Sequence, residues 1–310
     1  MGNYQKTDTP RIYVNIAEYL QSVGHAVPEY FTTLPYHQSK SSDYDPPGVA
    51  EPDPYAEFGV QTPYAQFPEG VLDENSFLFL LGAQWRSGVP TLFFYDSGTP
   101  LTLHTILDRT NIGAWRFDGG GETQVKIGRL DWMYSAILGF FYDFPLSADL
   151  NISLSIDFSG SDVTKTKFGS ELSNTMGNKN PLLYYHSATL GKLWDYTVWG
   201  PWSGGSRVGR RVWNVSFSFY EPSLLFPKNA SIRTSSADED DPVNHLFEDS
   251  TFQKVLQFTQ GGNLPFLFCS DKDNPSLDNH AIAKIDSKSI RFKQISNSMK
   301  SVSLKIREVW

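Results

Sequence analysis

The chain has 310 residues and a net charge of −8, with 34 Asp and Glu against 26 Lys and Arg. This acidic balance argues against a protein that binds nucleic acid through its overall charge. Aromatic residues make up 15% of the chain, which favours β-structure and argues against disorder over most of its length. The glycines and prolines are frequent and scattered, as is typical of short strands joined by turns.

Cysteine content and hydropathy bear on where the protein folds. Cys269 is the only cysteine, so no disulfide can form within the chain, and we expect folding in a cytosolic environment. The first residues lack the apolar core of a signal peptide. No apolar run approaches the roughly 20 residues of a membrane-spanning helix. We therefore expect no membrane insertion.

The first unit, residues 1–58, begins with a short strand at 11–15. Residues 17–23 follow as two predicted helical turns, which Gly24 is expected to end. From residue 35 to 70 seven prolines lie among tyrosines and acidic residues, a composition that cannot build a core alone. Two interpretations remain open for this segment: a loop over its own domain, or an arm that clasps a neighbouring subunit.

The second unit, residues 59–146, is predicted to be a jelly-roll-like β domain inserted in the N-terminal half. Short apolar or alternating runs recur there, separated by turn residues. The strands predicted in this unit lie at 76–81, 91–95, 114–117, 123–127 and 135–142.

The third unit, residues 147–310, is predicted to be a β-sandwich or barrel with one helix near 250–260. Residues 150–158 alternate strictly, which indicates a half-buried strand with Leu154 and Ile156 on the buried face. Asp249 or Ser250 is the expected helix cap. Further strands are predicted at 213–219, 264–268, 281–285, 289–292 and 301–307. We hypothesise that strand 11–15 completes this unit. With strands predicted in every unit, we expect the whole chain to be an all-β fold.

Charge is distributed unevenly between the two ends of the chain. Residues 1–80 carry eleven acidic residues against three basic ones, whereas residues 281–310 carry seven basic residues against two acidic ones. A basic C-terminal strand facing an acidic arm would favour head-to-tail subunit contacts, which generate closed rings. The candidate assembly residues are Arg210, Arg211, Trp213, Lys305, Arg307 and Trp310.

Residue patterns of known catalytic and cofactor sites are missing from the sequence. The six histidines have no pair at metal-ligand spacing, and Cys269 follows a strongly apolar run that indicates an inert, buried thiol. The chain contains neither a Gly-x-Ser-x-Gly elbow nor a phosphate-binding glycine loop. We therefore expect no cofactor, no metal and no enzymatic activity.

A cluster of aromatic residues in a Gly- and Ser-rich stretch offers the strongest alternative. It consists of Trp194, Tyr196, Trp199 and Trp202. Such a cluster fits a subunit interface, where tryptophan and tyrosine are enriched, and it also fits a platform for sugar rings. The alternatives are thus a module that binds host surface polysaccharide and a glycoside-cleaving β enzyme that depends on a carboxylate such as Asp195.

Several segments resemble structural tail proteins of tailed bacteriophages, particularly marine phages. They include Pro10-Arg-Ile-Tyr-Val-Asn15, Phe77-Leu-Phe-Leu-Leu-Gly82, Arg207-x-Gly-Arg-Arg-x-Trp213-Asn-Val-Ser-Phe-Ser-Phe219, Gly261-Gly-Asn-Leu-Pro-Phe-Leu-Phe268 and Ser303-Leu-Lys-Ile-Arg-Glu-Val-Trp310. The resemblance implies a distal-tail or baseplate subunit that forms a ring, such as a hexamer. It also implies contacts with other tail proteins, location in the virion tail and assembly in the host cytoplasm. The inserted β domain departs from that class, because many distal-tail proteins place their extra domain after the ring module.

Overall fold

The structure is a computed structural model, and its described residues are mostly β-strand. Three short helices accompany the strands in the described part: α1 (Ile16–Ser22), α3 (Pro222–Leu225) and α5 (Phe252–Phe258). The structure describes residues 9–25, 27, 31, 33, 64–66, 75–81, 84–85, 91–94, 104–109, 112–117, 124–128, 130–132, 135–149, 153–157, 163–165, 167, 171–173, 210–226, 251–276, 279–286 and 289–309.

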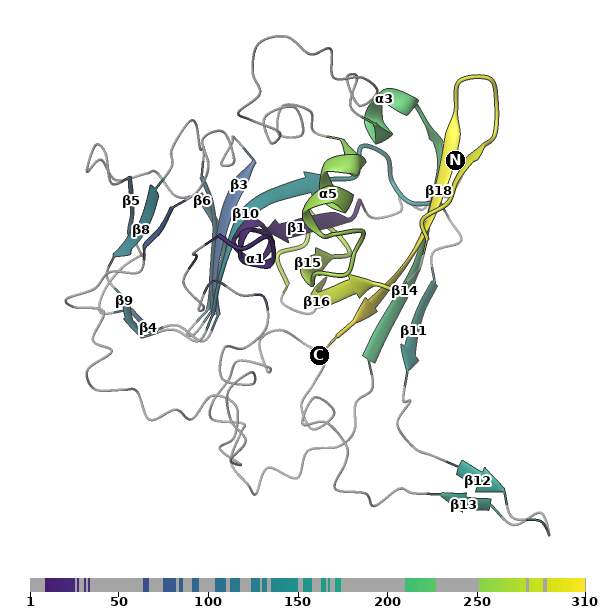
Figure 1. The fold of residues 1–310 in the computed structure, drawn as a ribbon, viewed down its shortest axis with the longest axis horizontal. Coiled ribbons are helices and arrows are strands. Elements are labelled where there is room, and N and C mark those ends of the chain that lie inside the picture. The colour runs from purple at the N-terminus through teal and green to yellow at the C-terminus, as the bar shows by residue number, and fades with distance from the viewer. Residues whose placement is uncertain are drawn as a thin grey trace, which may run out of the picture.

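One antiparallel sheet of eleven strands organises these elements. Its spatial order differs strongly from the order along the chain, as Figure 1 shows. From one edge to the other the strands are β11 (Ser153–Asp157), β14 (Arg210–Tyr220), β18 (Lys300–Glu308), β16 (His280–Ile285), β15 (Phe266–Cys269), β1 (Arg11–Asn15), β10 (Ser135–Asp143), β3 (Ser76–Leu81), β7 (Ile112–Phe117) and β6 (His104–Arg109), with β17 (Phe292–Gln294) paired to β18.

Strand β1 joins the two halves of this sheet. Ile12 lies opposite Phe268 of β15 on one side and opposite Tyr142 of β10 on the other. The pairing with β15 agrees with the hypothesis that residues 11–15 join the C-terminal strands, whereas the pairing with β10 was not predicted. Strands from 59–146 and from 147–310 therefore share one sheet. The division into a jelly-roll-like domain and a ring module stays a prediction.

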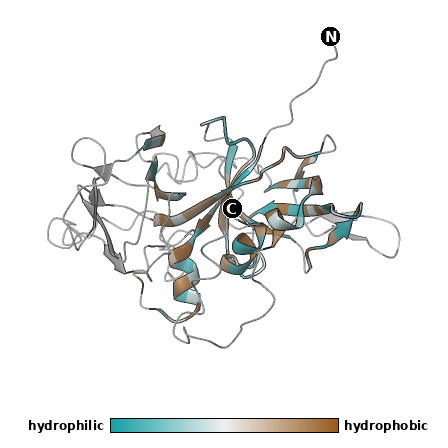
Figure 2. Ribbon diagram, turned by 90° about the horizontal axis from the view of Figure 1, so that it is seen from above, coloured by the Kyte–Doolittle hydropathy of each residue, from teal (hydrophilic) through white to brown (hydrophobic). Residues whose placement is uncertain are grey.

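The main hydrophobic core lies on one face of the sheet, where the sheet bends around α1 and α5 (Figure 1). Both halves of the sheet contribute to it, with Trp115 from β7 and Phe217 from β14 in the same cluster. Phe217 stacks on Phe144 at 4.3 Å between ring centroids. Figure 2 shows brown, apolar residues along the strands and alternating brown and teal on the helices, as expected for amphipathic helices. This bend brings strands from distant parts of the chain around one set of helices.

The helix ends follow from local sequence, with one correction. Gly24 has φ +94°, a conformation that suits glycine at the end of α1. Gly262 has φ +88° after α5, and a Cβ there would lie 2.5 Å from Cβ of Ile285. The predicted cap of α5 at Asp249 or Ser250 is wrong, because Thr251 is the residue before the helix, in extended conformation and without a side-chain capping hydrogen bond.

Three smaller sheets lie outside the large one in the described part of the chain. β2 (Tyr64–Gln66), β8 (Gln124–Gly128) and β5 (Thr91–Phe94) form one, and the other two are the pairs β4 (Gln84–Trp85) with β9 (Leu130–Trp132) and β12 (Val163–Lys165) with β13 (Glu171–Ser173). The strand predicted at 289–292 starts later, at Phe292, where it pairs with β18 as β17. Helix α3 and the strands β2, β4, β6 and β9 were not predicted.

Candidate assembly edge

The predicted site residues fall into three groups. Arg211 and Trp213 lie in β14, and Lys305 and Arg307 lie in β18. Arg210 begins β14, but its side chain lies outside the described part. The remaining residues, Trp194, Tyr196, Trp199, Trp202 and Trp310, are outside the described residues, so the glycan-platform alternative stays a prediction.

Trp213 and Arg211 contact the interior of their own chain. Trp213 is buried and packs edge-on against Phe268 at 5.1 Å between ring centroids. The guanidinium of Arg211 lies 5.0 Å from the Trp213 ring, which is close enough for a cation–π contact. Strand β14 is therefore held to the core by its aromatic side chain and by the arginine beside it.

Arg211 forms a buried ion pair with Glu308 of β18. The backbone N–H of Arg211 donates to Glu308 Oε2 at 2.9 Å, Nε donates to the same oxygen at 3.2 Å, and Nη2 donates to Oε1 at 3.0 Å. The side chains are only 13% and 3% exposed. Nη2 also donates to the His280 carbonyl at 2.9 Å, so one arginine links β14, β18 and β16. Sequence reasoning missed Glu308 because its partner lies 97 residues away.

Two other basic residues of the C-terminal strand β18 form ion pairs with acidic residues at the surface. Arg307 Nη2 lies 2.7 Å from Asp157 Oδ2, and Lys305 Nζ lies 2.8 Å from Asp286 Oδ2. The Asp157 partner comes from a different part of the sequence, so the net charge of residues 281–310 overstates the positive charge of this surface. These pairs leave Arg307 and Lys305 less able to attract an acidic partner than their sequence indicates.

Strand β11 is the terminal strand of the large sheet, and all its described side chains except that of Asp157 are exposed. The prediction that Leu154 and Ile156 are buried is wrong, since they are 57% and 52% exposed. Leu154 lies opposite Trp213, so it faces the same side of the sheet as the core. Among the described elements, however, only β14 pairs with β11. Alternation identified the faces of this strand, but it cannot reveal whether another layer covers either face.

A bulge in β14 exposes another apolar side chain near this edge. Phe219 has φ +65° and is 64% exposed, at the irregularity where the register with β18 shifts between Phe217 and Tyr220. The adjacent Ser218 is fixed to Asp149 by hydrogen bonds from its backbone N–H and hydroxyl. A left-handed conformation costs a non-glycine residue roughly 1–2 kcal/mol, so the surrounding contacts stabilise an unfavourable backbone conformation here.

Exposed apolar residues concentrate on this side of the sheet. Asp149 N–H donates to the Ser216 carbonyl at 2.8 Å, so the segment that precedes β11 also runs along β14. We use the name apolar edge for the exposed residues of these segments, which are Leu146, Leu154, Ile156 and Phe219. The other large exposed hydrophobic residues in the described part, Val23 and Ile295, lie after α1 and after β17.

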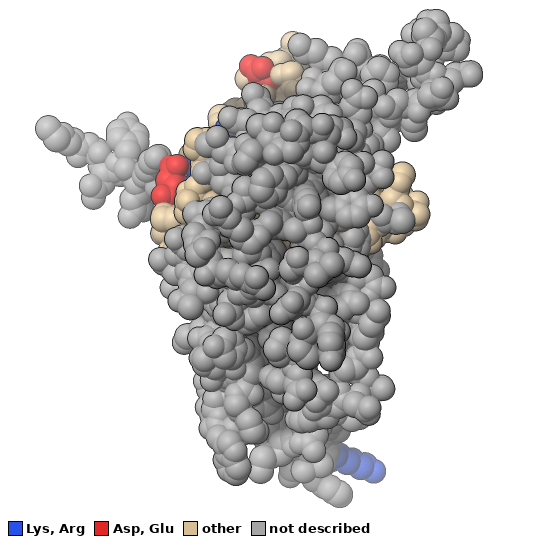
Figure 3. All heavy atoms as spheres, turned by 90° about the vertical axis from the view of Figure 1, so that its left-hand side faces the viewer, with Lys and Arg blue, Asp and Glu red and all other residues tan. Residues whose placement is uncertain are grey.

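Among the described residues on the face drawn in Figure 3, charged side chains do not gather into one site. The Asp, Glu, Lys and Arg residues that the structure describes on this face stand as separate groups (Figure 3). Within the described ranges, no three His, Cys, Asp or Glu residues lie close enough to hold a metal ion. None of the described helices combines the length and hydropathy needed to cross a membrane.

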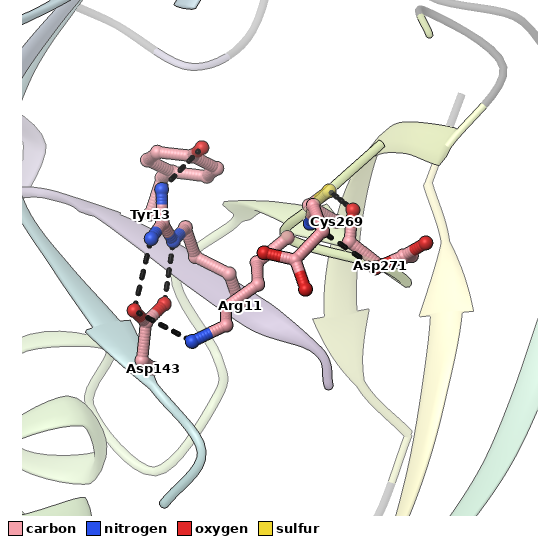
Figure 4. A network of polar contacts seen from close by, with 7 residues as sticks. Arg11, Tyr13, Asp143, Cys269 and Asp271 are labelled. Atoms are coloured by element: carbon pink, nitrogen blue, oxygen red, sulfur yellow. Dashed lines mark hydrogen bonds and ion pairs between the residues drawn. The ribbon is translucent and has the colours of Figure 1, made fainter. Parts of the chain in front are cut away.

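A polar cluster around Arg11 is the other notable group of ionisable residues (Figure 4). Its guanidinium binds Asp143 with two nitrogens, including Nη2 to Oδ2 at 2.9 Å, and lies 4.2 Å from the Phe141 ring. Lys272 Nζ is 3.7 Å from the same carboxylate, and Arg11 Nη1 donates to the Tyr13 hydroxyl at 3.4 Å. These contacts join β1 to β10 and to the segment after β15.

Cys269 and His280 near this cluster are buried and chemically quiet. The Cys269 thiol donates to the Asp271 carbonyl at 3.0 Å, and burial raises its pKa to about 12. Burial lowers the pKa of His280 to about 4, and its Nδ1 lies 3.0 Å from the Ser276 carbonyl. At neutral pH the thiol stays protonated and the imidazole stays neutral, so we interpret both groups as packing residues.

Comparisons with known proteins identify no relative of this chain. No protein-family model, no curated protein and no solved structure matches the chain.

Proposed function

We propose that this protein is a structural subunit that assembles with copies of itself. The apolar edge carries the proposal, because the terminal strand β11 exposes Leu154 and Ile156 beside an edge that no other described strand pairs. Sheet edges are usually protected by charge, proline or a covering element, since they pair readily with other strands. An apolar edge of this kind is typical of a surface that becomes buried on assembly.

The particular assembly that we propose is a ring in the tail or baseplate of a bacteriophage. In it the subunit connects the tail tube to peripheral fibres or receptor-binding proteins, and the particle is assembled in the host cytoplasm. The resemblance of the sequence to tail proteins supports this assignment. The resembling segments 213–219 and 303–308 belong to β14 and β18, and 266–268 belong to β15, so they all lie within the large sheet.

The contacts between neighbouring strands favour the rigidity that such a role requires. Strand β18 lies between β14 and β16, and the buried Arg211–Glu308 pair links all three strands. A rigid sheet presents its edge in one orientation, which reduces the entropy lost when subunits associate.

The test is the oligomeric state of the full chain, measured by mass photometry and native mass spectrometry with and without neighbouring tail proteins. We expect a closed oligomer that is weakened in the Leu154→Lys, Ile156→Lys double variant. The matched control is Val23→Lys with Ile295→Lys, which changes two exposed apolar residues outside the apolar edge. A chain that stays monomeric at high concentration with its partners present would refute the proposal, as would equal weakening by both double variants.

A further inference from the structure

Strand β11 has a sequence that is self-complementary in one antiparallel register. We propose that β11 pairs with β11 of a second copy about a two-fold axis through Ser155, an inference that rests on the proposed self-assembly and names a contact between two subunits. Because a two-fold contact closes at two subunits, the proposed ring would need a second, different contact in addition. In this register Leu154 lies opposite Ile156 of the second copy, and Ser153 lies opposite Asp157. A two-fold axis repeats each of these pairs, as in an isologous dimer.

The apolar side of this contact would continue a row that already crosses the sheet. Ile285 of β16 lies opposite Ile306 of β18, Ile306 lies opposite Trp213 of β14, and Trp213 lies opposite Leu154. Directly opposed residues share one face of the sheet. Ile156 of the second copy would therefore extend this row beyond Leu154. The contact would pack the exposed Leu154 and Ile156 side chains laterally against Ile156 and Leu154 of the second copy.

The polar side of the contact is complementary in hydrogen bonding. The Asp157 carboxylate is already held by Arg307 and would face the Ser153 hydroxyl, which can donate a hydrogen bond. The two Asp157 residues would lie four residues apart along the strands, roughly 13 Å, so no like charges would be opposed. Ser155 would face its own copy.

Other registers match less of the strand. An axis through Leu154 or Ile156 would pair only three of the five β11 residues with one another, whereas an axis through Ser155 pairs all five. The other terminal strand of the described sheet is β6, whose described His104 and Thr105 side chains are exposed and polar. In a head-to-tail contact between β11 and β6, no register would place apolar residues opposite Leu154 and Ile156 at the same time. We take that contact as the competing outcome.

Cysteine cross-linking distinguishes these arrangements. Ser155→Cys would place two thiols on directly opposed residues, whose Cα atoms lie roughly 4.5–5.5 Å apart, within the range of a disulfide. The matched control is Ser153→Cys, whose two copies would lie roughly 13 Å apart in the same register. Cys269 is buried and should not compete. With oxidised glutathione as the oxidant, we expect a covalent dimer from Ser155→Cys and none from Ser153→Cys.

A charge exchange across the axis provides an independent test. The Leu154→Lys, Ile156→Glu variant would place Lys opposite Glu in both symmetric pairs, whereas Leu154→Lys, Ile156→Lys would oppose two like charges. We expect the Lys/Glu variant to associate at least about tenfold more tightly than the Lys/Lys variant. Both variants remove the same apolar side chains from the same strand, so their difference reports the pairing itself.

The outcomes separate this inference from the proposed function. If the unmodified chain forms oligomers but Ser155→Cys cross-links no more than Ser153→Cys, and the two charge variants associate equally, the symmetric contact is wrong while self-assembly stands. A chain that does not associate refutes both. Cross-linking at Ser155 together with the charge difference supports the symmetric contact.

Discussion

Replacing Glu308 with alanine should strongly destabilise the fold. The change removes a carboxylate that accepts three hydrogen bonds from Arg211, in a pair whose side chains are 13% and 3% exposed. The guanidinium then remains largely buried without the Glu308 carboxylate. Removing one partner of a buried ion pair typically costs about 3–5 kcal/mol. That is a large part of the roughly 5–15 kcal/mol that separates the folded and unfolded states of a domain.

The matched control is Asp286→Ala, which breaks an ion pair in the same part of the sheet. The Lys305–Asp286 distance is 2.8 Å, but the side chains are 50% and 37% exposed, so we expect a loss of at most about 1 kcal/mol. The assay is equilibrium unfolding in urea, followed by circular dichroism at one protein concentration because self-association would affect the midpoint. Glu308→Gln separates the loss of charge from the loss of volume. Equal losses for Glu308→Ala and Asp286→Ala would refute the assigned role of burial.

Three further predictions concern the centre of the sheet. Gly139→Ala should lower the free energy of unfolding in urea by roughly 3 kcal/mol or more, because its Cβ would lie 1.9 Å from the Val14 carbonyl oxygen. The control Gly24→Ala has open space at its Cβ and should lower it by only about 1 kcal/mol. Similar losses for the two variants would contradict this prediction. Burial lowers the pKa of His280 from 6.5 to about 4, so between these pH values the unfolded state binds more protons than the folded state. The free energy of unfolding should therefore fall by about 3 kcal/mol as the pH drops from 6.5 to 4. The variant His280→Gln should lose this pH dependence. Cys269, whose pKa is raised to about 12, should react with a thiol reagent only in denaturant, and rapid labelling of the folded protein would show that the thiol is accessible.

Most individual strands were predictable because their signals are local. The alternation of Val215 and Phe217 with serines indicated β14, and the apolar run at 76–81 indicated β3. Gly24 marked the end of the first helix, where its positive φ angle suits glycine. The exact start of α5 was less predictable, since several neighbouring polar residues can serve as its cap.

The candidate site was only partly predictable. Arg211 and Trp213 were singled out as assembly residues, and the structure shows both packed inside their own chain. The exposed Phe219 had no sequence signal, because its position depends on a register shift between β14 and β18. Leu154 was assigned to the correct strand but to the wrong environment.

By itself, the sequence determined that the chain is all-β, where most strands lie and where α1 ends. These properties follow from side-chain alternation and from backbone preferences within a few residues. Only the tertiary structure decided that β1 joins β15 to β10, that Glu308 meets Arg211, and that β11 lies at the edge with its apolar residues exposed. The order of the strands, and whether another layer covers a face of the sheet, depend on contacts between residues far apart in the chain. A strand shows the same alternation of apolar and polar residues whether its apolar face is covered or exposed.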